Sequence, residues 1–247
     1  MAAAAHLSSS QEQAAIEAAT ALGLSGGRAP KRKQYDHALV LGGLIRACIT
    51  RPRYARELME SGIELSDVVA LGGFRPLKGD EITLASVLGV DASNEFEAMV
   101  AGVRFALGIA DEPSVERSDF VEPANDDWAV ATFPGYAASV IAAPSRLPDV
   151  RRANTADTFA WWGDKHPDAR GSHVLLITSQ IYVPYQGAVA IQNLGMPYGV
   201  TVETVGVSTS AADLGPHTQA FSAANYLQEI RSAIGGHLAL RDLLVES

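Results

Sequence analysis

The chain has 247 residues, of which 47% are hydrophobic and 19% are charged. This composition excludes a largely disordered chain and leaves enough apolar residues for a sizeable core. The 28 acidic and 19 basic residues give a net charge of −9, opposite in sign to that of most duplex-binding proteins, so we expect no nucleic acid as a partner. No run approaches the roughly 20 apolar residues that span a bilayer, so we expect no membrane partner. The single cysteine also favours a cytoplasmic protein.

Residues 1–34 are predicted to form a tail, one helix and a linker ahead of the main domain. An alanine-rich segment over residues 11–24 has the composition of a helix that is broken by glycines near its end. Residues 26–33 contain four basic side chains, and we interpret them as a solvated linker before the first strand. The first residues lack the basic start of a signal peptide.

Short apolar runs then alternate with segments of helical spacing. The apolar runs predict strands over residues 36–41, 67–71, 128–133, 138–143, 173–178 and 201–207. The helical spacing predicts helices over residues 51–61, 94–107, 154–164, 184–195 and 218–233. Asn94 and Asn154 are expected to cap two of these helices, and Gly195 is expected to end a third.

The alternation predicts an α/β protein with a three-layer Rossmann-like fold, in which helices cover both faces of a mainly parallel sheet. We expect one domain over residues 35–247, with the strands at 36–41 and 173–178 at the centre of the sheet. Only four residues separate the runs at 128–133 and 138–143, which indicates a hairpin. The acidic stretch over residues 111–127 is typical of an exposed loop or insertion.

In such a sheet the ligand lies beyond the carboxyl ends of the strands, so the residues that follow each strand are candidates for a binding site. Glycine pairs follow the first two strands, and their backbone N–H groups can approach an anion closely. A polar turn follows the strand at 173–178. The candidates from these strand ends are Gly42, Gly43, Arg46, Gly72, Gly73, Arg75, Thr178, Ser179, Gln180 and Tyr182.

Arginines are concentrated near these strand ends. Arg46 and Arg75 are predicted to bind a phosphate or carboxylate together with the glycine pairs. The alternative is that both arginines pair with local acids such as Glu95 or Asp80 and never contact a ligand. Arg51 and its neighbours Arg53 and Arg56 are interpreted as a solvated helix face.

Several other chemistries are not indicated. The six histidines show no metal-ligand spacing, so we expect no metal. Cys48 follows the first glycine pair closely, yet a buried thiol is a simpler interpretation than a nucleophile. The chain contains no Gly-x-Ser-x-Gly motif, the usual arrangement of a serine hydrolase.

The two glycine pairs, the acid Glu95, the segment Asn154-Thr155-Ala156-Asp157-Thr158 and the strand that ends in Thr178-Ser179 together resemble the ElyC/SanA/YdcF family. The resemblance covers most of residues 36–207 through short motifs. It implies a bacterial Rossmann-like domain of poorly defined function, and some members of the family are similar to S-adenosylmethionine binders.

The resemblance implies Glu95, with Glu81 a poorer match, and Asp157 as acidic site residues, and it implies Asn154 and Thr155 as ligand-binding residues. Tyr182 stands where the family has a histidine, and Tyr185 stands where it has an arginine. Tyrosine is a poor base at neutral pH because its ordinary pKa is about 10. The chemistry that the family's histidine performs is therefore in doubt in this chain.

Three functions remain open from the sequence. The first is an enzyme, a transferase or hydrolase, that acts on a small adenosyl, nucleotide or phosphate-bearing ligand, with S-adenosylmethionine as the cofactor that the resemblance suggests. In that case Glu95, Asp157 and Tyr182 are the candidate catalytic residues. The second is a non-catalytic protein that binds the same ligand class. The third is an interaction subunit whose N-terminal helix docks a partner or a second copy, giving a homo-oligomer.

Overall fold

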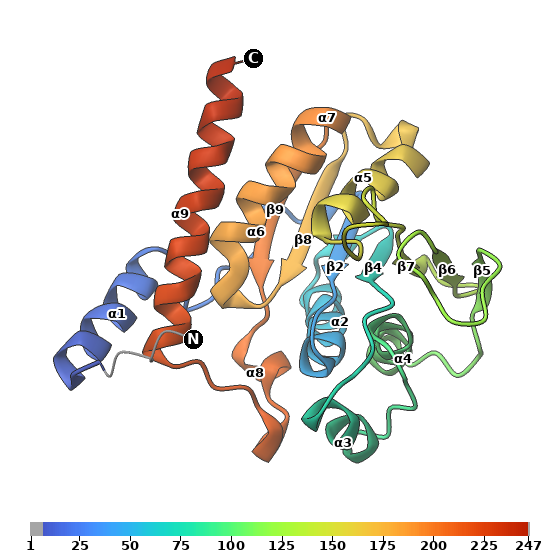
Figure 1. Cartoon of the computed structure of the whole chain (residues 1–247), viewed down its shortest axis with the longest axis horizontal. Helices are drawn as coiled ribbons and strands as arrows, with labels where there is room; N and C mark the ends of the chain where they lie inside the picture. Colours follow the sequence, from blue (N-terminus) through green and yellow to red (C-terminus); the bar gives the residue numbers. More distant parts are fainter. Residues whose placement is uncertain (1–6, 247) are drawn as a thin grey trace.

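The computed structural model describes residues 7–246, and a seven-stranded sheet in the order β5-β6-β7-β4-β2-β8-β9 forms its centre (Figure 1). The strands of this sheet are β2 (His37–Leu41), β4 (Val68–Gly72), β5 (Ser114–Arg117), β6 (Ala129–Thr132), β7 (Ala138–Ala142), β8 (His173–Thr178) and β9 (Thr201–Gly206). A second, two-stranded parallel sheet joins β1 (Gln34–Tyr35) to β3 (Glu64–Leu65).

The five strands from β7 to β9 are parallel, and the β5–β6 and β6–β7 pairings are antiparallel. If the five parallel strands are renumbered 1 to 5 in chain order, their order across the sheet is 3-2-1-4-5. This is the doubly wound order. The predicted mainly parallel α/β fold is therefore confirmed. The predicted hairpin is confirmed as well, because β6 pairs antiparallel with β7. The order reverses between β2 and β8, which are hydrogen-bonded neighbours.

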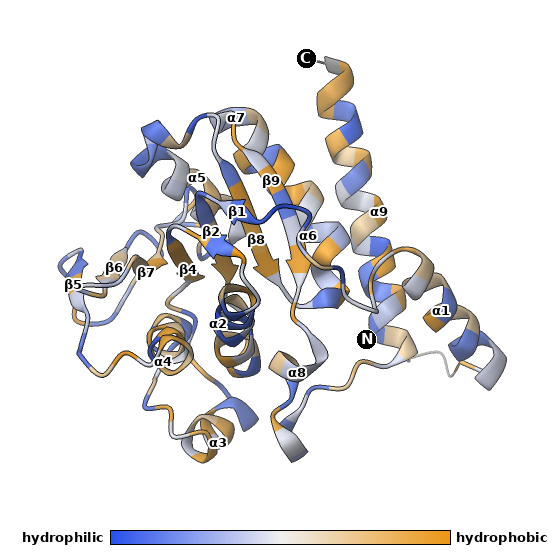
Figure 2. Ribbon diagram, turned by 180° about the vertical axis from the view of Figure 1, so that it is seen from behind, coloured by the Kyte–Doolittle hydropathy of each residue, from blue (hydrophilic) through white to orange (hydrophobic). Residues whose placement is uncertain are grey.

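Helices cover both faces of the sheet (Figures 1 and 2). The helices are α1 (Ser9–Ala21), α2 (Ile45–Glu60), α3 (Asp80–Val87), α4 (Glu95–Leu107), α5 (Thr155–Lys165), α6 (Val183–Ala190), α7 (Met196–Tyr198), α8 (Thr209–Ala212) and α9 (Ala223–Glu246). The pair α2 and α4 packs on one face, α5 and α6 pack on the other, and α1 packs against α9.

Alternate residues of the central strands enter two separate cores. In β2, Ala38 and Val40 face α2 and α4, while Leu39 and Leu41 face α5 and the segment that follows α6. Figure 2 shows the central strands as mostly hydrophobic. A strand that is buried on both faces needs apolar residues at successive positions, which explains why β2 and β8 read as unbroken apolar runs in the sequence.

Three predicted helices have different bounds in the structure. The helix after Pro184 does not end at Gly195; a π-helical segment carries it on to Tyr198, and Gly199 ends it with a left-handed φ of 66°. The last helix begins at Ala223 rather than near residue 218, and it runs to Glu246. The helix predicted over residues 51–61 begins a turn and a half earlier and contains Pro52 in its interior.

The acidic stretch over residues 111–127 is exposed, as predicted, but it also contains a regular element. Residues 114–117 form β5, the edge strand of the sheet, and all four of its residues are exposed. No helix within residues 7–246 is long and apolar enough to cross a membrane.

Candidate functional site

A cavity of about 660 Å³ lies at the carboxyl ends of the parallel strands, beside the point where the strand order reverses. Its walls come from the segments that follow β2, β4, β7 and β8 and from the start of α5. Of the sequence-predicted residues, ten line it: Gly42, Gly43, Gly72, Gly73, Arg75, Glu95, Asn154, Thr155, Ser179 and Tyr182. The other five predicted residues, Arg46, Asp157, Thr178, Gln180 and Tyr185, do not line it.

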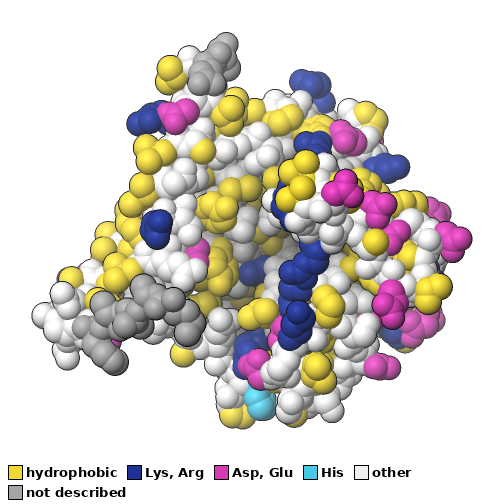
Figure 3. Space-filling view, in the orientation of Figure 1, with side chains coloured by type: hydrophobic (Ala, Val, Ile, Leu, Met, Phe, Trp, Pro, Cys, Tyr) yellow, Lys and Arg dark blue, Asp and Glu magenta, His cyan; other side chains and the backbone are white. Residues whose placement is uncertain are grey.

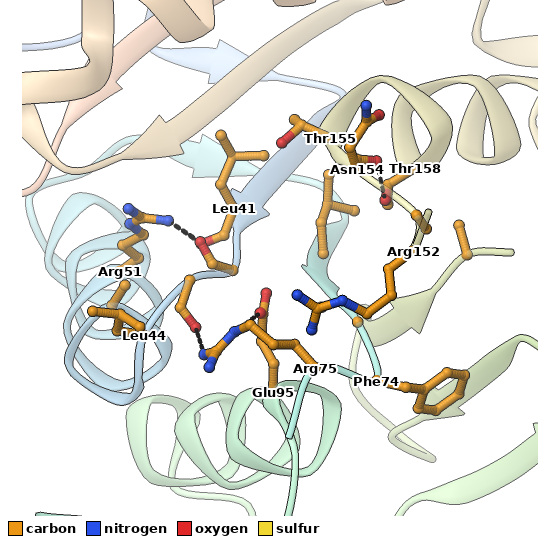
Figure 4. Close-up of a pocket in the computed structure, with 18 of the residues that line it drawn as sticks. Leu41, Leu44, Arg51, Phe74, Arg75, Glu95, Arg152, Asn154, Thr155 and Thr158 are labelled. Atoms are coloured by element: carbon orange, nitrogen blue, oxygen red, sulfur yellow. Dashed lines mark hydrogen bonds and ion pairs between the residues drawn. The ribbon is translucent and has the colours of Figure 1, made fainter. Parts of the chain in front are cut away.

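One glycine of each pair, Gly42 and Gly72, serves close packing inside the protein. A Cβ on Gly42 would lie 2.3 Å from Oε1 of Glu95 and 2.4 Å from the carbonyl oxygen of Leu71. A Cβ on Gly72 would lie 3.1 Å from Cα of Phe96, in the first turn of α4. The missing side chains therefore let α4 begin directly against the strand ends and bring the Glu95 carboxyl over Gly42 (Figure 4).

The start of α2, where a phosphate binds in many doubly wound proteins, is occupied by a carboxylate of the protein itself. Leu44, the N-cap residue, offers no side-chain cap. Instead, Oε1 of Glu81 accepts the backbone N–H of Ile45 at 3.0 Å. Burial acts to raise the pKa of Glu81, but hydrogen bonds from Arg75 and from backbone N–H groups outweigh it and leave the pKa lowered. Glu81 is therefore ionised and compensates the partial positive charge of the helix N-terminus.

Arg75 lines the cavity but pairs with local acids, which is the alternative that the sequence left open. Its Nη1 and Nη2 donate to Glu81 at 2.8 and 3.0 Å, its Nε donates to Glu95 at 3.2 Å, and its Nη2 also donates to the carbonyl of Gly43 at 2.9 Å. Two carboxylates therefore share one guanidinium, and the hydrogen bonds to Glu81 raise the pKa of Arg75.

Arg46 has the same kind of local role and lies outside the cavity wall. Its Nε donates to the carbonyl of His217 at 2.7 Å, and its Nη1 lies 3.8 Å from Asp80. Arg46 thus ties the loop before α9 to the first turn of α2. The alternative considered from the sequence, pairing with nearby acids, describes both Arg46 and Arg75.

Glu95 is the acidic side chain at the centre of the cavity (Figure 4). It is the first residue of α4, and its side chain is 16% exposed. Burial raises its pKa above the ordinary value, and Arg75 opposes this rise only in part. A carboxyl group that keeps its proton to a higher pH than usual can donate that proton or take it back during a reaction.

Arg51 is the main residue that the sequence interpretation missed, because it is a buried wall of the cavity rather than part of a solvated face. It is 5% exposed, and its Nη1 donates to the carbonyls of Leu41 and Gly42 at the end of β2. Its Nε and Nη2 donate to Oγ of Ser179, at 3.3 and 3.2 Å. The signal was present in the helical phase, since Arg51 has the 3-4-3 spacing of its buried neighbours Cys48, Ala55 and Leu58.

Of the residues in the polar turn after β8, only Ser179 and Tyr182 reach the cavity. Thr178 is buried, and Gln180 points away and donates from Nε2 to the carbonyl of Gly23, just after α1, at 2.7 Å. The ring of Tyr185 packs toward α9. Burial raises the pKa of Tyr182, so its phenol stays protonated at neutral pH. Tyr182 can therefore donate a hydrogen bond in the cavity, and it cannot act there as a base.

Asp157 stabilises the start of α5 and is not part of the cavity wall. It forms a capping box with Asn154, and its carboxylate is also paired with Arg151. Burial acts to raise its pKa, but the hydrogen bond from Arg151 and those from backbone N–H groups outweigh this and leave the pKa lowered. Its oxygens are engaged within the protein, so the structure favours a capping role over the predicted catalytic one.

The cavity wall also contains polar residues for which the sequence held no signal, because they come from loops and from α6, far apart in the chain. They are Asn125, Asp127, Arg151, Arg152, Gln186 and Gln219. Arg152 extends toward Glu95 (Figure 4), and within the described part of the chain its side chain makes no hydrogen bond or ion pair. Among residues 7–246, no group of three or more His, Cys, Asp or Glu side chains is placed to hold a metal ion.

Together, the fold and the cavity define a doubly wound, Rossmann-like α/β protein with a polar pocket at its switch point. No family model matches the chain, and no solved structure matches it. The uncharacterized proteins Rv3785 of Mycobacterium tuberculosis and Mb3814 of Mycobacterium bovis are each 34% identical to it over 242 residues, which cover 95% of this chain and 67% of theirs. The chain belongs to the family of these mycobacterial proteins.

Proposed function

We propose that the protein is an enzyme that binds a small ligand with an adenosyl, nucleotide or phosphate group in this cavity. The reaction is a group transfer or a hydrolysis. The cavity has the size and the position at the switch point that are usual for a small-molecule site. Four arginines line it in a chain whose net charge is −9. Arg75 and Arg151 are paired with carboxylates of the protein, whereas, among residues 7–246, Arg51 and Arg152 are not. Figure 3 shows Lys and Arg side chains gathered along the hollow of this face. The two arginines without a carboxylate partner in the described chain favour an anionic ligand.

The single observation that carries the proposal is the buried carboxyl of Glu95, whose charge is only partly offset by Arg75. It lies at the centre of the cavity, its pKa is raised by burial, and its guanidinium partner Arg75 is shared with Glu81. A titratable group with a shifted pKa in a polar cleft is typical of an active site. In the proposed reaction Glu95 holds a proton on a carboxyl oxygen and transfers it to or from the ligand.

The resemblance to the ElyC/SanA/YdcF family is consistent with this proposal and suggests S-adenosylmethionine as a cofactor, which supplies a transferable methyl group when it is bound. The cavity offers groups that suit it. Leu44, Leu71 and Phe74 provide an apolar wall for an adenine ring, Glu95 can accept hydrogen bonds from ribose hydroxyls, and Arg51 can bind a carboxylate.

A ligand screen followed by turnover measurements tests the proposal. Thermal-shift assays with S-adenosylmethionine, adenine nucleotides and sugar phosphates identify binders, and mass spectrometry identifies ligands that co-purify. We expect Glu95→Gln to lower kcat with the identified ligand by about 100-fold or more, the usual contribution of a general acid or base. Glu97→Gln is the matched control, because Glu97 lies on the same helix but is exposed and outside the cavity wall. Equal turnover in the two variants would contradict the role of Glu95.

A non-catalytic binding protein for the same ligand class is the second candidate. It is favoured by Tyr182, a protonated phenol where the resembled family has a histidine, and by the lack of any histidine or cysteine among the described residues that line the cavity. Tight binding by the wild type without turnover, and a changed affinity in Glu95→Gln, would favour this candidate over the enzyme.

A further inference from the structure

We propose that the cavity binds an oxyanion of its ligand, a phosphate or a carboxylate, in a subsite formed by Arg51, Ser179 and Tyr182. This subsite lies in the crevice between the carboxyl ends of β2 and β8. The inference rests on the proposed function in taking the cavity as a ligand site. It differs from the arginine site expected from the sequence, because neither Arg46 nor Arg75 belongs to it.

The first argument is the charge of Arg51. Its side chain is buried, and among residues 7–246 no carboxylate oxygen lies within 4.0 Å of its nitrogens. Its hydrogen-bond partners are neutral, namely the carbonyls of Leu41 and Gly42 and the hydroxyl of Ser179, and Glu95 acts on its charge only from beyond ion-pair distance. A buried cation normally has an anionic partner, because desolvation is costly when no opposite charge offsets it. Arg51 lines the cavity, so an anion in the cavity can reach it and supply that charge.

The second argument is the hydrogen-bonding capacity of the hydroxyl groups beside Arg51. Oγ of Ser179 accepts from both Nε and Nη2 of Arg51, which leaves its own proton free to be donated. The hydroxyl of Tyr182 has no partner among the described residues, and its ring lies 6.0 Å from Cζ of Arg51. Burial keeps that phenol protonated. The three side chains line the same cavity and each carries an N–H or O–H donor, and such a set of donors suits an oxyanion and disfavours a cation.

The third argument is that the other arginines of the cavity are less suited to bind the anion. Arg75 is neutralised by Glu81 and Glu95, and Arg151 is neutralised by Asp157. Arg152 is unpaired, but it is exposed. Water and salt screen an exposed charge far more than a buried one. Arg51 is thus the cation from which a bound anion would gain most.

Inorganic phosphate and acetate, titrated separately by calorimetry into the full chain, test the subsite without knowledge of the natural ligand. We expect the wild type to bind at least one of them, and the stronger binder identifies the oxyanion class. We expect Arg51→Gln to weaken that binding by about 10- to 100-fold, the usual effect of losing a charge-assisted hydrogen bond. The matched control is Arg56→Gln, which changes an exposed arginine on the same helix that pairs with Glu60 and should bind as the wild type does.

Since Arg51 also holds the end of β2, Tyr182→Phe and Ser179→Ala provide tests that leave Arg51 in place. The hydroxyl of Tyr182 makes no hydrogen bond within residues 7–246, so its removal should affect stability little. We expect each variant to weaken phosphate or acetate binding by about 3- to 10-fold, as for a single hydrogen bond. Unchanged binding in both, or no binding of either anion by the wild type, would overturn the subsite.

Loss of binding in Arg152→Gln, with Tyr182→Phe unaffected, would also overturn the subsite by placing the anion at the start of α5. None of these results depends on Glu95. The proposed function fails on a different result, namely equal turnover of the screened ligand by Glu95→Gln and Glu97→Gln.

Discussion

Replacing Glu81 by glutamine tests how strongly the internal carboxylate stabilises the site. In the wild type, Glu81 receives two hydrogen bonds from Arg75, at 2.8 and 3.0 Å, and caps α2 through the N–H of Ile45. Removing one partner of a buried ion pair costs about 3–5 kcal/mol. Arg75 keeps Glu95 at 3.2 Å, and a glutamine oxygen can still accept from Ile45, so we expect a smaller loss of about 2–3 kcal/mol. For a chain of this length, the melting temperature should fall by about 4–12 °C.

The assay is urea unfolding at pH 7 and again near pH 3. The pKa of Glu81 is lowered in the folded state, so its contribution to stability is complete above the unfolded pKa, about 4.3, and is lost as the pH falls through the folded value. The difference between variant and wild type should therefore shrink near pH 3. Glu112→Gln is the control, because Glu112 forms an exposed pair with Arg104 and should lose less than about 1 kcal/mol. Two results would refute the reasoning. One is an equal loss of unfolding free energy in the two variants at pH 7, and the other is a loss in Glu81→Gln that does not change with pH.

Two further predictions concern the centre of the cavity. Gly42→Ala should lower the free energy of unfolding by about 1–3 kcal/mol, because its Cβ would meet Glu95 and the fixed carbonyl of Leu71. Gly73→Ala, whose Cβ meets no atom within 4 Å, should stay within about 0.5 kcal/mol of the wild type in the same urea titration. The pKa of Glu95 is raised in the folded state, so ionisation of Glu95 destabilises the native protein as the pH increases. Glu95→Gln lacks this loss, so its melting temperature minus that of the wild type should rise between about pH 4 and pH 7. A constant or falling difference in scanning fluorimetry would contradict the raised pKa.

The central architecture could be predicted from the sequence because its local and tertiary signals agree. β8 is an unbroken apolar run that is buried on both faces, and its predicted bounds, His173–Thr178, are those of the strand. Asn154 begins α5 with a capping box, as its spacing to Asp157 indicated. The edge strand β5 could not be predicted, because all four of its residues are exposed and it exists through pairing with β6. The far end of α9 was missed for a related reason, since its exposed residues lack a sharp apolar period.

The position of the cavity could be predicted from the sequence. Which of its arginines are paired with carboxylates could not be predicted. The rule that ligands bind at the carboxyl ends of parallel strands identified both glycine pairs and Ser179 as neighbours of one cleft. Which arginine is free depends on contacts between segments distant in sequence. Arg75 is engaged by Glu95, twenty residues away, and Arg51 reaches Ser179 across 128 residues. Such pairs leave no periodic signal in the chain, although the helical phase of Arg51 indicated its burial.

The exposed strand β5 has a consequence for how the protein behaves at high concentration. An edge strand presents unpaired backbone groups that can pair with a strand of another molecule and start aggregation. Residues 111–127, which contain β5, carry seven carboxylates and one arginine, and Figure 3 shows acidic side chains gathered on this side of the molecule. Two such edges repel each other as they approach. The acidic stretch therefore disfavours edge-to-edge association through charge repulsion. This repulsion is lost when its carboxylates are protonated.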